Sequence, residues 1–251
     1  MKHEKTLSRS FLTFFFMLGV IVFSKIKLHP IFGTGGRFSI LAMLGPVIPA
    51  FVGGSFGAIA IFGARFIQLL IGISQAKSWF SYISYTPLFL AGIYFARMFK
   101  KKANHAIMPI IIIFLFIIHP IGRQVWYFSL FWLIPIIITF ARPYLWRLVR
   151  KHDIPLIYLY SLSATFIDHA VGSVMYLYYL NIPPIYWITA IPYVLPERAL
   201  FALGITFFYL FIRESLRALQ RSLPIKIVII EENISGLEHE ELREELSLRT
   251  S

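Results

Sequence analysis

Thr165-Phe166-Ile167-Asp168-His169-Ala170-Val171-Gly172 lies in the middle of an otherwise apolar run from Ile154 to Leu180. Read as a helix that rises about 1.5 Å per residue, the run places Asp168 roughly 21 Å from Ile154, well inside a bilayer core about 30 Å thick. A charge at the bilayer centre costs on the order of 2.5 to 3.5 kcal/mol on insertion scales, so such groups usually face a partner or a watery cavity. The stretch therefore predicts a membrane helix in which Asp168 meets something polar.

One side of this helix is small and polar, and we expect it to face the interior of the protein. On a period of 3.6 residues this side collects Ser161, Ala164, Thr165, Asp168, Gly172 and Met175.

The composition is that of an integral membrane protein. Hydrophobic residues make up 58% of the 251 residues and charged residues 14%, against about 45 to 50% and 25% in soluble domains. The chain has no cysteine, which excludes disulfides, thiolate metal sites and cysteine nucleophiles. We therefore predict an all-α, polytopic transmembrane helix bundle.

The positive charge of the chain has an uneven distribution. Residues 1–226 hold 22 Lys and Arg against five Asp and Glu, an excess that would indicate nucleic acid in a soluble protein. Here the three strongest basic clusters, 97–102, 142–151 and 213–226, fall in alternate connections between apolar runs, as the positive-inside rule requires. We expect a multi-pass protein of the cell membrane with both termini in the cytoplasm and no nucleic-acid partner.

The apolar runs of residues 1–226 predict about six to eight membrane-spanning helices, followed by an acidic cytoplasmic tail over residues 227–251. The runs 11–24, 38–51 and 106–119 are shorter than the roughly 20 residues that a perpendicular span needs. Each of these three runs could therefore be a tilted span, a re-entrant segment, or a span that is lengthened by its flanking residues.

Glycine and proline set the expected breaks between the runs. The segment from Lys25 to Arg37 contains one proline and three glycines and is expected to be a loop. The run from Trp79 to Phe95 is expected to form one helix. Pro196 is expected to lie in the first turn of a final helix that reaches Phe211.

The side chains that could bind a ligand are charged or aromatic residues within or near the apolar runs. They are Arg65, Asp168, His169, Trp187, Tyr193, Glu197 and Arg198.

Arg65 lies on a small-residue stripe and is a second charge within an apolar run. We expect Asp168 to pair with Arg65, which would leave His169 free to titrate or bind a ligand. Two interpretations stay open: a polar pocket for a small solute or ion, and a buried ion pair that only fixes helix packing.

Glu197 and Arg198 also admit two interpretations. They could line an outward-facing pocket together with Trp187 and Tyr193, whose rings suit flat or cationic solutes. Alternatively, Glu197 is a carboxylate at a helix start, Arg198 reaches toward the interface, and the aromatic residues form an interfacial belt.

The sequence contains no H-E-x-x-H or P-loop pattern, and residues Arg147 to Asp153 lack the spacing of lipid phosphatases. We therefore predict no enzyme activity, no cofactor and no metal site, and any pumping would depend on a partner or an ion gradient.

Several segments resemble the substrate-binding subunits of energy-coupling-factor transporters. Phe38-Ser-Ile-Leu-Ala-Met-Leu-Gly-Pro46 together with Gly53-Gly-Ser-Phe-Gly57 and Arg65-Phe-Ile-Gln-Leu-Leu70 is similar to their second and third helices. Tyr85 to Arg97 with Lys100-Lys-Lys102 resembles the fourth helix, and Pro196 to Arg217 the last. Members have six helices, so His105 to Leu145 would be an inserted hairpin.

The resemblance implies a binder of a vitamin, cofactor precursor or metal ion, with a transmembrane coupling subunit and cytosolic ATPases as partners. Its pocket would open outward and include Lys25 to Arg37, Asp168, His169 and Trp187 to Arg198. Two alternatives come from other classes: a structural or assembly protein in the membrane without a ligand, and a lipid-modifying membrane enzyme that uses Asp168 and His169.

Overall fold

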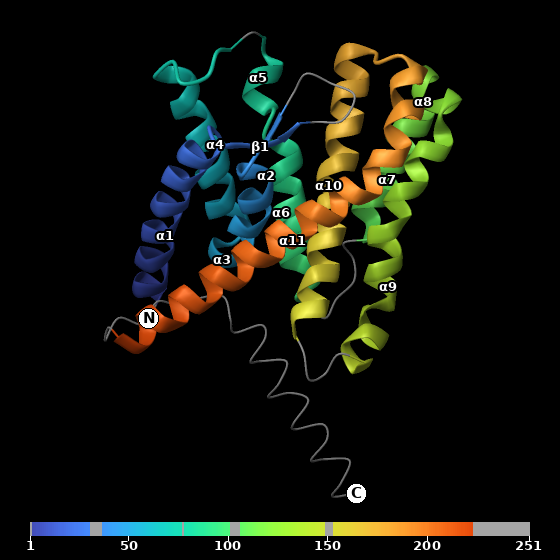
Figure 1. Ribbon diagram of the computed structural model, residues 1–251. Helices are drawn as coiled ribbons and strands as arrows, with labels where there is room; N and C mark the ends of the chain where they lie inside the picture. Colours follow the sequence, from blue (N-terminus) through green and yellow to red (C-terminus); the bar gives the residue numbers. More distant parts are fainter. Residues whose placement is uncertain (1, 31–36, 77, 101–105, 149–152, 223–251) are drawn as a thin grey trace, which may run out of the picture.

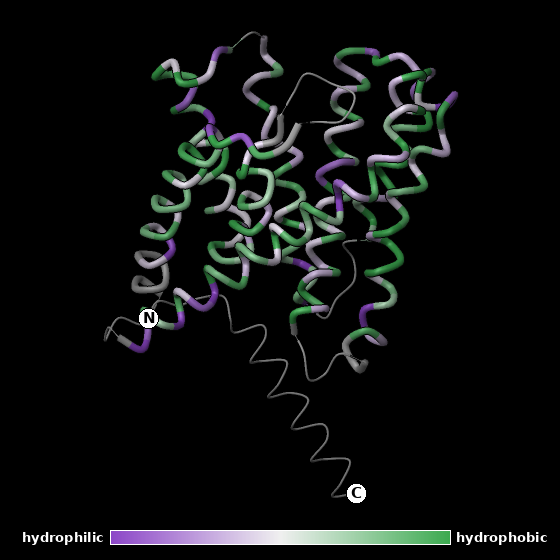
Figure 2. Tube along the Cα trace, in the orientation of Figure 1, coloured by the Kyte–Doolittle hydropathy of each residue, from purple (hydrophilic) through white to green (hydrophobic). Residues whose placement is uncertain are grey.

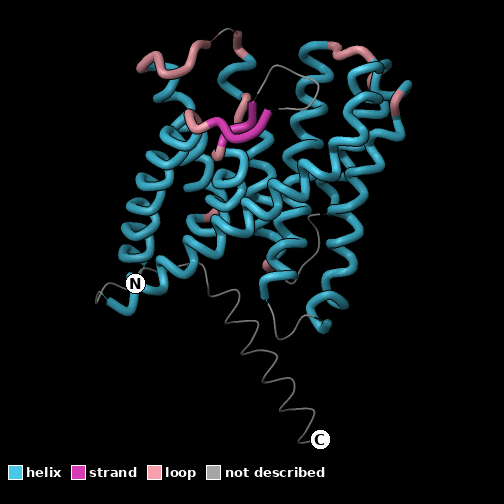
Figure 3. Tube along the Cα trace, in the orientation of Figure 1, coloured by secondary structure: helices cyan, strands magenta, loops and turns pink. Residues whose placement is uncertain are grey.

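The computed structural model describes residues 2–30, 37–76, 78–100, 106–148 and 153–222. The described chain is a bundle of helices with one small two-stranded sheet near one end (Figures 1 and 3). The acidic tail expected over residues 227–251 lies outside the described residues.

The elements follow one another along the chain in the order α1 (Lys2–Phe23), β1 (Lys27–Pro30), β2 (Arg37–Ser39), α2 (Leu41–Leu44), η1 (Gly45–Val47), α3 (Ile48–Val52), α4 (Gly54–Leu70), α5 (Phe80–Ile83), α6 (Thr86–Met98), α7 (Ile107–Ile118), α8 (Pro120–Gln124), η3 (Trp126–Trp132), α9 (Leu133–Leu148), α10 (Asp153–Leu180) and α11 (Pro184–Ser222).

Successive long segments run alternately toward the two ends of the bundle, and α11 crosses it obliquely (Figure 1). The start of α1 and the end of α11 lie at the same end, which is the lower end in the figure. Hydrophilic positions gather toward the ends of the helices and in the connections, whereas the middle of the bundle is mostly apolar (Figure 2).

Three described helices are long and apolar enough to cross a membrane, judged by length and composition: Trp126–Leu145, Ile154–Leu180 and Pro184–Arg221. Four shorter apolar helices accompany them: Ser8–Phe23, Leu41–Val52, Gly54–Leu70 and Ile107–Ile118. The prediction of a helical bundle is confirmed, and at least three of its described helices could span a membrane. The number of crossings, six to eight, stays a prediction.

The short segment α2–η1–α3 lies in the core. Prolines 46 and 49 divide the predicted 38–51 run into three short turns of helix, because proline cannot donate the backbone hydrogen bond of a continuous helix. Nine of the twelve residues from Leu41 to Val52 are buried. A Cβ on Gly92 of α6 would lie 2.7 Å from the Pro49 ring, so the lack of a side chain lets α6 approach this segment closely.

Three sequence expectations about the elements are wrong. The segment from Lys25 to Arg37 is not only a loop, because β1 and β2 pair antiparallel with Lys27 opposite Ser39. The run from Trp79 to Phe95 is broken between α5 and α6, where Pro87 lies in the first turn of α6.

The third concerns α11, which does not begin at Pro196. It begins at Pro184 and runs for 39 residues with Pro192 and Pro196 inside it. Asn181 ends α10 with a positive φ of 49°, so the link between the two helices is short. Prolines are tolerated inside membrane helices because neighbouring groups satisfy the freed carbonyls.

Candidate ligand site between α10 and α11

Helices α10 and α11 form an antiparallel hairpin, and this geometry brings Asp168 and Arg198 together. Asp168 lies twelve residues before the end of α10 at Leu180, and Arg198 lies fourteen residues after the start of α11 at Pro184. At about 1.5 Å per residue these positions are roughly 18 and 21 Å from the link, so the two residues lie at a similar depth.

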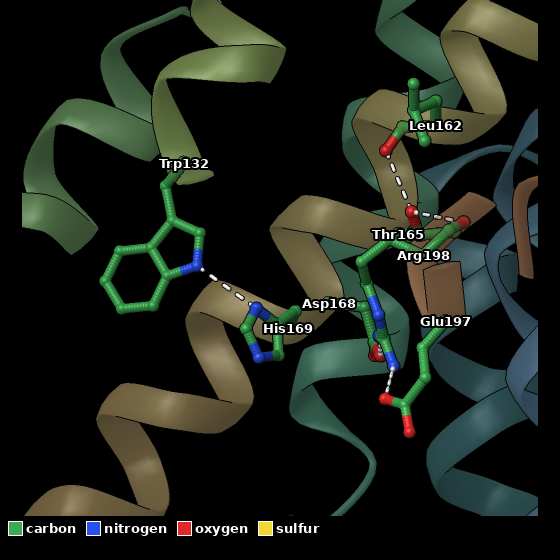
Figure 4. A network of polar contacts seen from close by, with 7 residues as sticks. All are labelled: Trp132, Leu162, Thr165, Asp168, His169, Glu197 and Arg198. Atoms are coloured by element: carbon green, nitrogen blue, oxygen red, sulfur yellow. Dashed lines mark hydrogen bonds and ion pairs between the residues drawn. The ribbon is translucent and has the colours of Figure 1, made fainter. Parts of the chain in front are cut away.

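Three charged side chains meet at this point (Figure 4). Arg198 Nη1 is 3.8 Å from Asp168 Oδ2, and Arg198 Nη2 is 3.5 Å from Glu197 Oε2. The Arg198 side chain is 4% exposed, Glu197 12% and Asp168 23%. We call these three residues the charged cluster.

Both distances in the charged cluster exceed the 2.7 to 2.9 Å of a tight charge-assisted hydrogen bond. Arg198 lies within ion-pair distance of both carboxylates and balances part of their charge. Its guanidinium carbon also lies 4.7 Å from the centre of the Phe201 ring, a cation–π contact one turn further along α11.

Hydroxyl groups join the two helices on the side of the charged cluster that faces away from the link. Thr165 Oγ1 donates to the Leu162 carbonyl at 2.9 Å and lies 3.3 Å from the Arg198 carbonyl. Thr206 Oγ1 lies 3.0 Å from Ser161 Oγ and 2.8 Å from the Ala202 carbonyl. Ser161 and Thr165 belong to the small, polar side expected to face inward, and both are buried.

His169 points away from the charged cluster and toward Trp132 (Figure 4). Trp132 Nε1 donates to His169 Nδ1 at 3.3 Å, and the Phe128 ring centre is 5.6 Å from that of His169. Neighbouring helix positions differ by about 100°, so the side chains of Asp168 and His169 point in different directions and contact different residues. Trp132 therefore engages Nδ1 of His169, and a ligand-binding role for this ring stays a prediction.

Trp187 also lies in this aromatic group. Its ring centre is 5.1 Å from that of Phe128 and 5.2 Å from that of Phe116, and its Nε1 donates to the Ile182 carbonyl at 3.0 Å. Eleven residues of helix, about 16 Å, separate Trp187 from Arg198. The structure therefore places Trp187 in the aromatic core rather than beside the charged cluster.

Tyr193, one helical turn before Glu197, is 42% exposed. Its position is that expected of a residue at the bundle surface.

Arg65 does not pair with Asp168, so this expectation is wrong. Arg65 Nε donates to the Ser81 carbonyl at 2.8 Å, and its guanidinium carbon lies 5.1 Å from the Tyr85 ring centre. Arg65 is near the end of α4 and reaches α5, whereas Arg198 lies on the helix that packs directly along α10. The partner of Asp168 is Arg198.

Sequence reasoning could have found this pair, because residues equidistant from a short link face each other in a helical hairpin. A final helix that begins at Pro196 puts Arg198 at a helix start, so only the observed start at Pro184 predicts the pairing. No pattern in the sequence points to Trp132 as the partner of His169, since 37 residues separate them.

Among the residues that the structure describes, no three His, Cys, Asp or Glu side chains gather closely enough to hold a metal ion. No protein-family model, curated protein or solved structure matches this chain. The resemblance to substrate-binding subunits of energy-coupling-factor transporters therefore stays a prediction.

Proposed function

We propose that this protein binds a small solute at the charged cluster between α10 and α11 and helps to move it across the membrane with energising partner subunits. The observation that carries the proposal is the charged cluster itself, which lies in two helices long and apolar enough to cross a membrane. Ionisable groups at such positions are costly and usually serve a function.

The charges of the charged cluster favour one kind of solute. Two carboxylates and one guanidinium sum to one negative charge when all are ionised. Carboxylate oxygens accept hydrogen bonds and attract positive charge, so a solute with a positive group or several hydrogen-bond donors suits this cluster. Asp168 is its most exposed member and is the group we propose to contact the solute.

The arrangement of basic residues supports the proposed topology, with both termini in the cytoplasm and six to eight crossings. Arg97 and Arg213 lie toward the ends of α6 and α11. Arg142 of α9 donates to the Met98 carbonyl at the end of α6 at 3.1 Å. These helix ends lie at the end of the bundle where α1 begins (Figure 1), and basic residues favour the cytoplasmic side.

A second interpretation is that the charged cluster only fixes α10 against α11. Its support is the enclosure of Arg198, which has a carboxylate on two sides and the Phe201 ring on a third. A buried ion pair of this kind can serve packing alone, and the protein would then be a structural or assembly protein of the membrane.

Native mass spectrometry of the detergent-extracted protein, looking for a retained small molecule, tests the proposal. We expect the wild-type chain to retain one and Asp168→Asn and Glu197→Gln to lose it while remaining folded. Glu214→Gln is the matched control, because Glu214 is exposed and pairs with Arg217 near the end of α11. Equal retention by wild type and Asp168→Asn would overturn the proposal and leave the packing interpretation.

A further inference from the structure

The side of α10 that carries Asp168 continues toward the outer end of the helix through Gly172, Tyr176 and Tyr179. These residues follow one another at intervals of three or four, so they form one stripe. A solute that travels along α10 from this end reaches Asp168 by passing the stripe.

Residues from Trp79 to Pro87 cover this stripe. The Phe80 ring stacks on Tyr179 with centres 4.3 Å apart and planes at 10°, and it lies 5.1 Å from the Tyr176 ring. The Trp79 ring contacts Tyr179 edge-on at 5.7 Å. Next to Asp168, a Cβ on Gly172 would lie 3.8 Å from the Pro87 ring.

Helix α5, which contributes Phe80 to this cover, is short and mostly exposed. It has four residues, and only Phe80 is buried, while Trp79, Tyr82 and Ile83 are exposed. A break at Ser84 and Tyr85 separates it from α6, and Gly72 at a φ of 74° ends the preceding helical segment. Segments with few buried apolar contacts open at low free-energy cost.

Arg65 is the polar attachment of α5. Its Nε–H donates to the Ser81 carbonyl at 2.8 Å from the neighbouring helix α4. The Tyr85 ring lies under the Arg65 guanidinium, and the Tyr85 hydroxyl donates to Gln68 Oε1 at 3.0 Å. Gln68 is fully buried in α4, so this set of contacts ties the start of α6 and α5 to a fixed helix.

We propose that α5 is a gate over the Asp168 stripe of α10, that the stacking of Phe80 on Tyr179 closes it, and that Arg65 is its latch. The inference rests on the proposed function, because a gate matters only if a solute reaches Asp168. It gives Arg65 a role as a positioning residue rather than a ligand.

The absence of cysteine from the sequence allows a direct test with a single reporter thiol. Gly172→Cys places the thiol on the stripe at a partly buried position, where a Cβ has ordinary van der Waals distance to Pro87 at the start of α6. The probe is a charged methanethiosulfonate reagent. It is added to the full chain in detergent, where both ends of the helix bundle are accessible. The labelling rate then follows the population of the open form.

We expect slow labelling of Gly172→Cys, and a rate about fivefold to tenfold higher when Phe80→Ala or Arg65→Ala is added, since each removes one closing contact. Arg123→Ala and Phe66→Ala are matched controls that change an exposed arginine and an exposed phenylalanine elsewhere, and they should leave the rate unchanged. A second reporter, Ala170→Cys, lies at a fully buried position of the same helix and should stay unreactive throughout.

If neither Phe80→Ala nor Arg65→Ala changed the labelling rate of Gly172→Cys, the gate would be overturned, while solute binding at Asp168 would remain intact. A parallel rise at Ala170→Cys would show general loosening of the bundle and would also overturn the gate. Solute retention by Asp168→Asn, in contrast, would overturn the proposed function whatever the labelling shows.

Discussion

Replacement of Arg198 by methionine should destabilise the protein more than any change to an exposed ion pair. Methionine keeps much of the length and apolar stem of the side chain but removes the guanidinium. Asp168 and Glu197 would then remain as two partly buried carboxylates that have lost the Arg198 guanidinium, in helices that could span a membrane. Loss of one partner of a buried ion pair costs about 3–5 kcal/mol, because the other charge is left uncompensated.

Burial rather than distance sets this magnitude, and the same helix offers a control. Arg217 Nη1 is 3.0 Å from Glu214 Oε1, closer than either distance in the charged cluster, but these two side chains are 37% and 57% exposed. Exposed pairs contribute about 0–1 kcal/mol because water screens them. Arg217→Met should therefore have little effect on stability.

Unfolding of the purified variants in mixed micelles, followed by tryptophan fluorescence, measures both effects. The triple variant Arg198→Met, Asp168→Asn, Glu197→Gln carries no charge at the cluster and should recover much of the lost stability. If Arg198→Met were no less stable than Arg217→Met, the charged cluster would not be a low-dielectric site, and the reasoning about its function would fail with it.

Two further predictions concern the packing of the bundle. Gly122→Ala should cost at least about 2 kcal/mol of unfolding free energy, because its Cβ would lie 1.9 Å from the Phe116 backbone oxygen; Gly63→Ala, which meets only a flexible methionine sulfur at 3.4 Å, is the control, and equal stabilities would contradict the prediction. Tyr94→Phe should cost about 1–3 kcal/mol, since the buried hydroxyl bonds a carbonyl of α9 at 2.9 Å and a hydroxyl at 2.7 Å; thermal unfolding should show no comparable shift for the exposed Tyr82→Phe.

The sequence by itself determined the class of the protein and the position of one unusual residue, the charged Asp168 within an apolar helix. The apolar runs and the sparse charges predict a helical membrane bundle because a bilayer accepts only backbones that satisfy their own hydrogen bonds. The same reasoning shows that Asp168 needs a polar partner. Both conclusions follow from composition and from spacing along one helix.

Only the tertiary structure decided which partner Asp168 has and where helices break. Prolines have a different effect in each case: Pro46 and Pro49 interrupt a segment, whereas Pro192 and Pro196 lie inside the continuous α11. Proline removes one hydrogen-bond donor wherever it lies, and the surrounding packing decides whether the helix continues. Because α11 continues back to Pro184, the hairpin pairs Arg198 with Asp168 and leaves Arg65 to hold α5.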